Sequence, residues 1–323
     1  MAVQNLFHLR ALKIANPGST AAFNITHMEN LNTDRNFRQI SQSSAGDFAP
    51  CSQGLSGTDP SISFDSTQLL DLFNMFSQST SSQQSLITDL SAGNVSLIYA
   101  AGKPNAIREA DTASEHIIGT LANNAAIYWN SLSVSQDEKA SVSVVVKTSG
   151  TAPGNDALSF SVVPLTGANA APTACHEIFT LGPVYYGGIQ IEGVTSVSWQ
   201  NNVNEINFRS DGSKSTSYFG VQDFAPQVTV TTSDGDELTV GGIGGSGHAG
   251  LTTGLLVVYL KKFSKTNFFV SNATTEHIRL VANAGLKMVP SISGNPAEFA
   301  MQFMLEKDSG GNVFTAETGV AIP

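Results

Sequence analysis

Charged residues are scarce in this chain of 323 residues. Only 13% of them are Asp, Glu, Lys or Arg, against about a quarter in an average soluble domain, whereas Ser, Thr, Asn, Gly and Ala are abundant. A polar but mostly neutral surface is typical of a protein covered by other subunits. The formal net charge is −10. This charge excludes a grip on nucleic acid through phosphate contacts, although not a surface past which nucleic acid slides.

Cysteine and long apolar runs are also lacking. The two cysteines, Cys51 and Cys175, make no disulfide framework, so we expect free thiols in a chain folded in the cytosol. Residues 1–10 contain no basic segment followed by a continuous apolar stretch, so no secretory signal is expected. The chain has no run of about 18 apolar residues, so no membrane span is expected.

No arrangement typical of catalysis or of metal and cofactor binding is found. Residues 242–247 fit the glycine spacing of a dinucleotide-binding loop, but a strand-like run follows them where that motif needs a helix. His116 and His277 recur at matching places, for which a packing or hydrogen-bonding role is favoured over a duplicated site. Residues 175–177, Cys-His-Glu, are adjacent in sequence. Neighbouring side chains in a strand point in opposite directions, so these residues form no catalytic dyad by themselves. Residues 234–237 form a short acidic turn with too few oxygen ligands for a calcium loop. The sequence therefore predicts no enzyme, no cofactor and no metal site.

Much of the chain is present twice. Residues 25–72 reappear without a gap 166 positions later, so that residues 60–64 align with residues 226–230. A second stretch, which begins at Glu115-His116-Ile117, reappears at Glu276-His277-Ile278, a shift of 161. We place the two copies in residues 1–168 and 169–323, because the sequence around residues 167–172 is typical of a linker. A duplicated domain most often serves symmetric assembly.

Both copies have the alternating pattern of β-strands. In the second copy, Val197, Trp199 and Val203 share one face, and the apolar phase slips before Ile206. In the first copy the pattern restarts in the same way at Ile40. Because an odd-residue slip reverses the two faces, a β-bulge or a bend is expected at the matching place in both copies. Return segments from Gly54 and Gly220 complete a long hairpin in each copy, with one apolar and one neutral polar face.

One amphipathic helix is expected near residues 66–76, with Ser66 as its cap. The counterpart in the second copy contains Gly235 and looks more like a turn. The expected fold class is mainly β, with two tandem similar β-sandwich or barrel domains, each with a long β-hairpin and a short helix. The apolar stripe of the first helix comprises Leu69, Leu72, Phe73 and Phe76.

The long two-faced hairpin resembles the tail-tube proteins (major tail proteins) of tailed bacteriophages. The best local match runs from Gly193 to Asp234 and closes with Pro226-Gln227-Val228-Thr229-Val230. In that family, six copies of a β-sandwich domain form a ring, and their hairpins join into an inner β-barrel around the DNA channel. A few members carry two domains and make trimers with pseudo-sixfold symmetry, and the duplication is similar to theirs.

This resemblance implies a structural virion protein that is assembled in the host cytoplasm and located in the tail. It implies trimeric rings stacked into a tube, with the tape measure, terminator and distal tail proteins as neighbours. DNA would transit the lumen without specific binding. Arg35 and Arg38 make the first hairpin less uniformly uncharged than this function favours. The residues expected to face the lumen are Asn32, Asp34, Asn36, Arg38, Ser198, Gln200, Asn202 and Asn204.

Two other classes of function remain open from the sequence. A tandem β-sandwich receptor-binding protein would carry exposed aromatic platforms, yet the chain has only two Trp, and Trp199 is in phase with the apolar face. A tail-tip or baseplate hub protein would share the fold and form a single ring. A hydrolase or other enzyme would need a convergent site, which the sequence does not contain.

Overall fold

The computed structural model describes most of the chain, and the described residues form a mainly β fold with one helix. Its strands pair antiparallel throughout the described segments. The expectation of a mainly β fold is therefore confirmed. The described residues are 6–15, 22–34, 36–43, 45, 49–77, 86–90, 95–102, 115–121, 125–148, 158–164, 176–209, 216, 218–234, 249–264, 269–293, 298–309 and 311–323.

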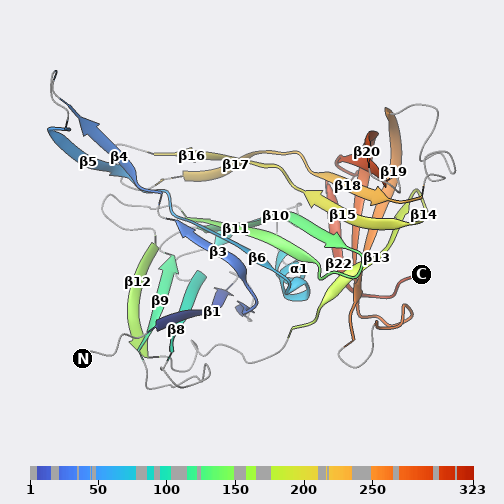
Figure 1. The fold of residues 1–323 in the computed structure, drawn as a ribbon, viewed down its shortest axis with the longest axis horizontal. Coiled ribbons are helices and arrows are strands. Elements are labelled where there is room, and N and C mark those ends of the chain that lie inside the picture. The colour runs from blue at the N-terminus through green and yellow to red at the C-terminus, as the bar shows by residue number, and fades with distance from the viewer. Residues whose placement is uncertain are drawn as a thin grey trace.

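A five-stranded sheet lies at one end of the molecule (Figure 1). It comprises β1 (Leu6–Ala15), β2 (Ala22–Ile25), β8 (Val95–Gly102), β9 (Glu115–Leu121) and β12 (Leu158–Pro164). The strand order is β12-β9-β8-β1-β2. Leu12, Ile14 and Leu97 of this sheet belong to the buried core.

A thirteen-stranded sheet spans the rest of the molecule. Its path runs β14-β13-β19-β20-β21-β18-β15-β10-β11-β6-β3, with β22 added to β20 and β7 added to β10. The strands are β3 (Glu29–Asp34), β6 (Ser61–Ser66), β7 (Leu86–Leu90), β10 (Ala125–Ser135), β11 (Ser141–Thr148), β13 (Phe179–Tyr186), β14 (Ile189–Ile191), β15 (Val194–Gln200), β18 (Gln227–Thr232), β19 (Ala249–Lys262), β20 (His277–Ser293), β21 (Glu298–Leu305) and β22 (Phe314–Val320).

Two narrow ribbons extend from the large sheet along one side of the molecule (Figure 1). One pairs β4 (Arg38–Gln42) with β5 (Ser52–Gly57), and the other pairs β16 (Val203–Phe208) with β17 (Tyr218–Phe224). Each ribbon continues the strand pair at its base, which is β3 and β6 for the first and β15 and β18 for the second. The long hairpins that the sequence predicts are therefore present in both copies.

The same strand order occurs twice. The order β12-β9-β8-β1-β2 in the N-terminal half corresponds to β22-β20-β19-β13-β14 in the C-terminal half. The hairpins also agree in register. Asn32 pairs with Ser63, and Ser198 pairs with Thr229, so both partners have moved by the 166 positions of the sequence repeat.

The predicted slip of the apolar phase is confirmed in both hairpins. The register of the first ribbon shifts between Arg38 and Gln39, and that of the second shifts between Asn204 and Glu205. These are matching positions of the repeat. A bulge at this place reverses the faces of each ribbon relative to the strands at its base.

The two hairpins also bend at matching asparagines. Asn36 and Asn202 have positive φ angles of 46° and 47°, a conformation that asparagine tolerates better than most residues. Asn36 Nδ2 donates a hydrogen bond of 2.8 Å to the Asp59 carbonyl oxygen, and Asn202 Nδ2 donates one of 2.9 Å to that of Ala225. Each asparagine therefore ties the incoming strand to the returning one.

The helix α1 (Leu69–Ser77) lies at the centre of the molecule and contacts β2 and β22 (Figure 1). Its predicted apolar stripe is fully buried. The Ser66 hydroxyl accepts a 3.1 Å hydrogen bond from the Gln68 backbone N–H, as a capping side chain does, but Ser66 lies two residues before the start of the helical hydrogen bonds. The Gln68 carbonyl accepts the first helical hydrogen bond, from Leu72. The counterpart helix of the second copy would begin at Gly235, outside the described residues.

Aromatic side chains occupy the centre of the core. Trp129 and Trp199 are both fully buried, and their ring centroids lie 5.9 Å apart. Both also contact Phe314, with centroid distances of 5.3 Å from Trp129 and 5.1 Å from Trp199. Because Trp129 lies on β10, Trp199 on β15 and Phe314 on β22, this cluster joins both halves of the chain in one core.

Candidate functional site: a neutral polar sheet face

Five strands of the large sheet carry a row of uncharged polar side chains on one face. Ser141, Ser133, Ser198, Thr229 and Gln302 are consecutive cross-strand partners on β11, β10, β15, β18 and β21. Directly opposed residues in antiparallel strands point to the same face. These five residues therefore form a continuous row, and we call the face that carries them the neutral polar face.

The adjacent row points into the core. Val142, Leu132, Trp199, Val228 and Phe303 are cross-strand partners on the same five strands. All five are fully buried. The strict alternation between strand neighbours fixes the register, since a shift by one residue would move the whole apolar row to the polar side.

Four of the eight residues expected in a lumen lie on the large sheet. Ser198 belongs to the row itself. Gln200 is exposed and pairs with Ser131 on β10 and with Gln227 on β18. Asn32 and Asp34 are exposed on β3, at the end of the sheet.

The other four residues lie beyond the sheet. Asn36 and Asn202 are the bend residues described above, so their first role is structural. Arg38 and Asn204 are exposed on the two ribbons, next to the bulges. The eight residues are therefore distributed over the large sheet, the two bends and the two ribbons.

Sequence reasoning did not place other strands beside the hairpins, so it missed part of the neutral polar face. Its members on β10 and β11 alternate with buried Leu and Val. This alternation of serine with branched apolar residues was the available signal. It does not show that the two strands lie beside the hairpins. The missed residues are Ser131, Ser133, Ser141, Ser143, Thr229 and Gln302.

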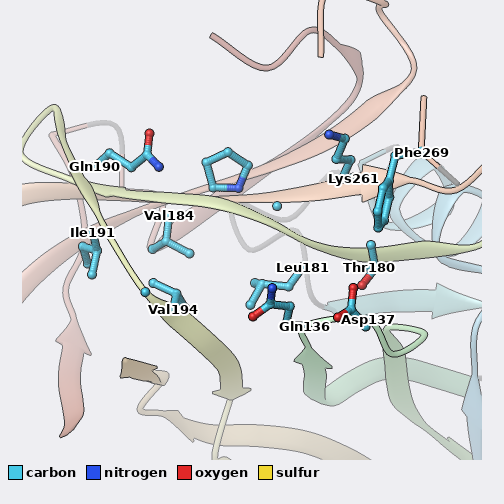
Figure 2. Close-up of a pocket in the computed structure, with 13 residues that line it drawn as sticks. Gln136, Asp137, Thr180, Leu181, Val184, Gln190, Ile191, Val194, Lys261 and Phe269 are labelled. Carbon is cyan, nitrogen blue, oxygen red and sulfur yellow. The ribbon is translucent and has the colours of Figure 1, made fainter. Parts of the chain in front are cut away.

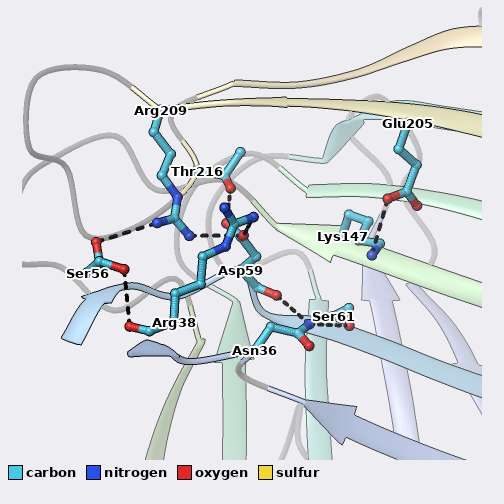
Figure 3. Close-up of polar contacts among 9 residues, drawn as sticks. All are labelled: Asn36, Arg38, Ser56, Asp59, Ser61, Lys147, Glu205, Arg209 and Thr216. Carbon is cyan, nitrogen blue, oxygen red and sulfur yellow. Dashed lines mark hydrogen bonds and ion pairs between the residues drawn. The ribbon is translucent and has the colours of Figure 1, made fainter. Parts of the chain in front are cut away.

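A charged cluster joins the two hairpins beside this face (Figure 3). An oxygen of the Asp59 carboxylate lies 2.7 Å from Arg38 Nη2 and 2.9 Å from Arg209 Nη2. The hydroxyl of Thr216 donates a hydrogen bond to the other oxygen. Arg38 and Asp59 belong to the first hairpin, whereas Arg209 and Thr216 belong to the second, so the cluster fixes one hairpin against the other.

The environment of Asp59 favours the ionised form of its carboxyl. Partial burial alone would raise the pKa of its carboxyl, but Thr216, Arg209 and Arg38 outweigh that effect and hold the pKa below its ordinary value. A carboxyl with a depressed pKa in the folded state stabilises the fold above its unfolded pKa. This contribution is lost as the pH falls through the lower, folded-state pKa.

Asp59→Asn is expected to lower the free energy of unfolding at neutral pH by about 1 kcal/mol, because the ion pairs are partly exposed. The loss should shrink in acid, below the ordinary carboxyl pKa of 3.8, where the wild-type group is also becoming neutral. Urea unfolding of the wild type and the variant, at neutral pH and in acid, measures this loss of unfolding free energy. Asp223→Asn, at an exposed position on β17, is the matched control and should show a smaller change. A loss that grows in acid would contradict this account.

A second ion pair neutralises a lysine on the same side of the sheet. Lys147 Nζ on β11 lies 3.2 Å from the Glu205 carboxylate on β16. Burial and the hydrogen bond that Tyr128 donates to Glu205 raise the pKa of the Tyr128 hydroxyl. The positive charge of Lys147 is therefore balanced next to the neutral polar face (Figure 3).

The described histidine of the recurring pair has a structural role. His277 is fully buried; its Nδ1 accepts a 3.0 Å hydrogen bond from the Lys262 backbone N–H. Its Nε2 lies 3.0 Å from the Ser271 carbonyl oxygen, to which it can donate. The expected hydrogen-bonding role is confirmed for His277, while the side chain of His116 lies outside the described residues.

Within the described ranges, the other candidates for chemistry do not assemble into a site. Residues 242–247, Cys175 and residues 235–237 lie outside the described residues. A cavity of about 390 Å³ beside β13 is lined by Asp137 and Lys261 among others. Figure 2 shows these two charged side chains on opposite sides of the strand that carries Thr180 and Leu181. The charges therefore do not converge as acid–base chemistry would require.

In the described segments, no group of three or more His, Cys, Asp or Glu residues could hold a metal ion. Among the same residues, no helix combines the length and the apolar character that crossing a lipid bilayer requires. Comparison of the sequence with models of known protein families and with curated proteins finds no match.

Proposed function

We propose that this chain is a structural virion protein that assembles into trimeric, pseudo-hexameric rings, which stack into the tail tube of a bacteriophage and conduct its genome. The neutral polar face carries the proposal. Each phosphate that a protein cation neutralises adds to the binding free energy. A channel wall of Ser, Thr, Asn and Gln therefore lets DNA pass without holding it. Arg38 and Lys147, two cations that lie beside this face, are both ion-paired.

The proposal includes two tandem tail-tube-like β domains, residues 1–168 and residues 169–323. Support comes from the repeated strand order and from the matching registers and bulges of the two hairpins. Three such chains place six like units around an axis. A closed ring also removes the free strand edges that make open sheets prone to uncontrolled pairing.

The proposed location is the tail of the virion, after assembly in the host cytoplasm. The main partner is a further copy of the same chain. Tape measure, terminator and distal tail proteins would contact the inside and the ends of the tube, and DNA would cross the lumen without specific recognition. No enzymatic activity belongs to this proposal.

The burial of both tryptophans disfavours a receptor-binding protein that uses exposed tryptophan platforms. A tail-tip or baseplate hub ring shares the neutral polar face and is the alternative that the experiment must separate. It differs in the number of rings, because a hub stops at one.

Negative-stain electron microscopy of the purified full-length protein, over a range of concentrations, tests the proposal. We expect hollow tubes built from stacked rings, and their length should increase with concentration. Single closed rings would indicate a hub protein and contradict the tube. Dispersed monomers at every concentration would contradict both and favour a receptor-binding protein.

A further inference from the structure

Strand β15 is covered along its outer edge by a strand from the other half of the chain. It pairs with β18 on one side and with β10 on the other. Across the second junction, Ser198 lies opposite Ser133, and Gln200 lies opposite Ser131. The junction between β10 and β15 therefore connects the N-terminal half to the C-terminal half through backbone pairing.

Strand β3 is the counterpart of β15 in the first copy, but its position differs. Its inner edge pairs with β6, as β15 pairs with β18. It is the last strand of the large sheet, and no strand in the described part of the chain pairs with its outer edge. Among the described strands, the edge that β10 covers in the second copy is therefore open in the first.

The end of β20 is the counterpart of β10. Ser131-Leu132-Ser133 of β10 matches Ser291-Ile292-Ser293 of β20 at a shift of 160. Each triplet follows a register shift in the pairing with the next strand, which is β11 for β10 and β21 for β20. The two triplets therefore occupy equivalent places in the two halves.

The opposite edge of this triplet is also open. On that side β10 pairs first with β7 and then, from Ser131 onward, with β15. The same side of β20 pairs with β19 as far as Met288, and no described strand continues this edge along Ser291–Ser293. In the part of the chain that the structure describes, two complementary edges are thus open, β3 and the end of β20.

The two open edges lie far apart within one chain. Six strands separate β20 from β3 in the sheet order, and Figure 1 draws β20 at the upper right and β3 left of the centre. A second copy can supply what each edge lacks. Such a contact joins different surfaces of the two copies, which is the geometry that generates rings.

We propose that β3 of one copy adds to the end of β20 in the next copy, antiparallel, and that this pairing reproduces the β10–β15 junction. The two repeat shifts fix the register, with Asn32 opposite Ser293 of the next copy and Asp34 opposite Ser291. The proposal rests on the duplication proposed above and not on the role in DNA passage. It makes the large sheet and its neutral polar face continuous from copy to copy.

Disulfide trapping of the full-length chain tests this register, because directly opposed positions on paired strands suit a disulfide. The background carries Cys51→Ser and Cys175→Ser, so that no native thiol competes. Asn32→Cys with Ser293→Cys should give dimers and closed trimers on oxidation, seen by non-reducing electrophoresis. Asn32→Cys with Ser291→Cys is two residues out of register and should react about tenfold more slowly, because diagonal neighbours are farther apart.

The chain supplies its own positive control. Ser133 and Ser198 are the equivalents of Ser293 and Asn32 and are already paired within one chain. Ser133→Cys with Ser198→Cys should therefore give an oxidised monomer with altered mobility and no larger species.

The outcomes separate this interface from the proposed function. Suppose that sedimentation shows rings or tubes while only the Ser133/Ser198 pair forms a disulfide. The proposed β3–β20 interface is then wrong, but the proposed ring assembly still stands. Equal trapping in both registers would also overturn the interface. If no association occurs at any concentration, the interface and the proposed assembly fail together.

Discussion

Trp199→Ala is expected to lower the free energy of unfolding of the dissociated chain by about 3–5 kcal/mol, the range for removing a buried aromatic side chain. Trp199 is fully buried and contacts Trp129 and Phe314. Its indole N–H also donates a 3.1 Å hydrogen bond to Asn201 Oδ1. The truncation thus leaves a cavity and an unsatisfied buried oxygen. Denaturant unfolding followed by circular dichroism measures the loss.

A pair of milder variants separates packing from hydrogen bonding. In the described part of the chain, the buried indole N–H of Trp129 has no hydrogen-bond partner, so Trp129→Phe removes volume alone. Trp199→Phe removes similar volume and also leaves Asn201 Oδ1 without its donor. The amide group of Asn201 still donates to the Trp129 carbonyl oxygen at 2.8 Å. We expect Trp199→Phe to cost about 1–3 kcal/mol more, the penalty of an unsatisfied buried group. Equal costs would show that the Asn201 bridge contributes nothing.

Gln200→Arg is expected to slow DNA passage through the assembled tube at low salt by more than about tenfold, and the delay should disappear as salt rises. Gln200 is exposed at the end of β15, beside the neutral polar row, and the proposed stacked rings would repeat the new charge along the whole lumen. Each phosphate contact to duplex DNA adds about 0.9 to the slope of log affinity against log salt. Ejection of DNA from particles carrying the variant, timed at several salt concentrations, measures the effect.

Gln200→Glu is the matched control for this variant. It changes the same position with similar bulk and the opposite charge, so passage should stay at the wild-type rate or rise. Electron microscopy should show normal tubes for both variants. If both variants slow DNA passage equally, the size of the side chain and not its charge is responsible. Failure of both to assemble would show that Gln200 lies in a subunit contact instead of a lumen.

The elements predicted well from the sequence are those that short-range pattern determines. The stripe from Leu69 to Phe76 fixed one face of α1, and the apolar slip before Ile40 and Ile206 located both bulges. In each case the apolar period alone requires the structure, because only one arrangement buries the apolar residues. The neutral polar face of the hairpins followed from the same alternation.

What the sequence did not reveal depends on contacts between distant segments or on unusual backbone. Nothing near Ser133 shows that β10 lies against β15, because the pairing is set by the whole sheet. Asn36 and Asn202 read as alternating strand residues, yet their positive φ makes them bends. No glycine follows either asparagine, so the usual turn signal is missing. The joining of Asp59 to Arg209 likewise depends on how the two hairpins pack.

The junction between β10 and β15 has a consequence for the size of the assembly. If the contact between chains repeats this junction, then one rotation angle relates every unit to the next, inside a chain and between chains. If each unit is rotated by one sixth of a circle relative to the last, without a shift along the axis, three chains close into a ring. A shift along the axis at each step gives an open spiral instead. Side chains packed around Trp129 and Asn201, which set that angle, would therefore decide the bore of the tube without touching its lumen.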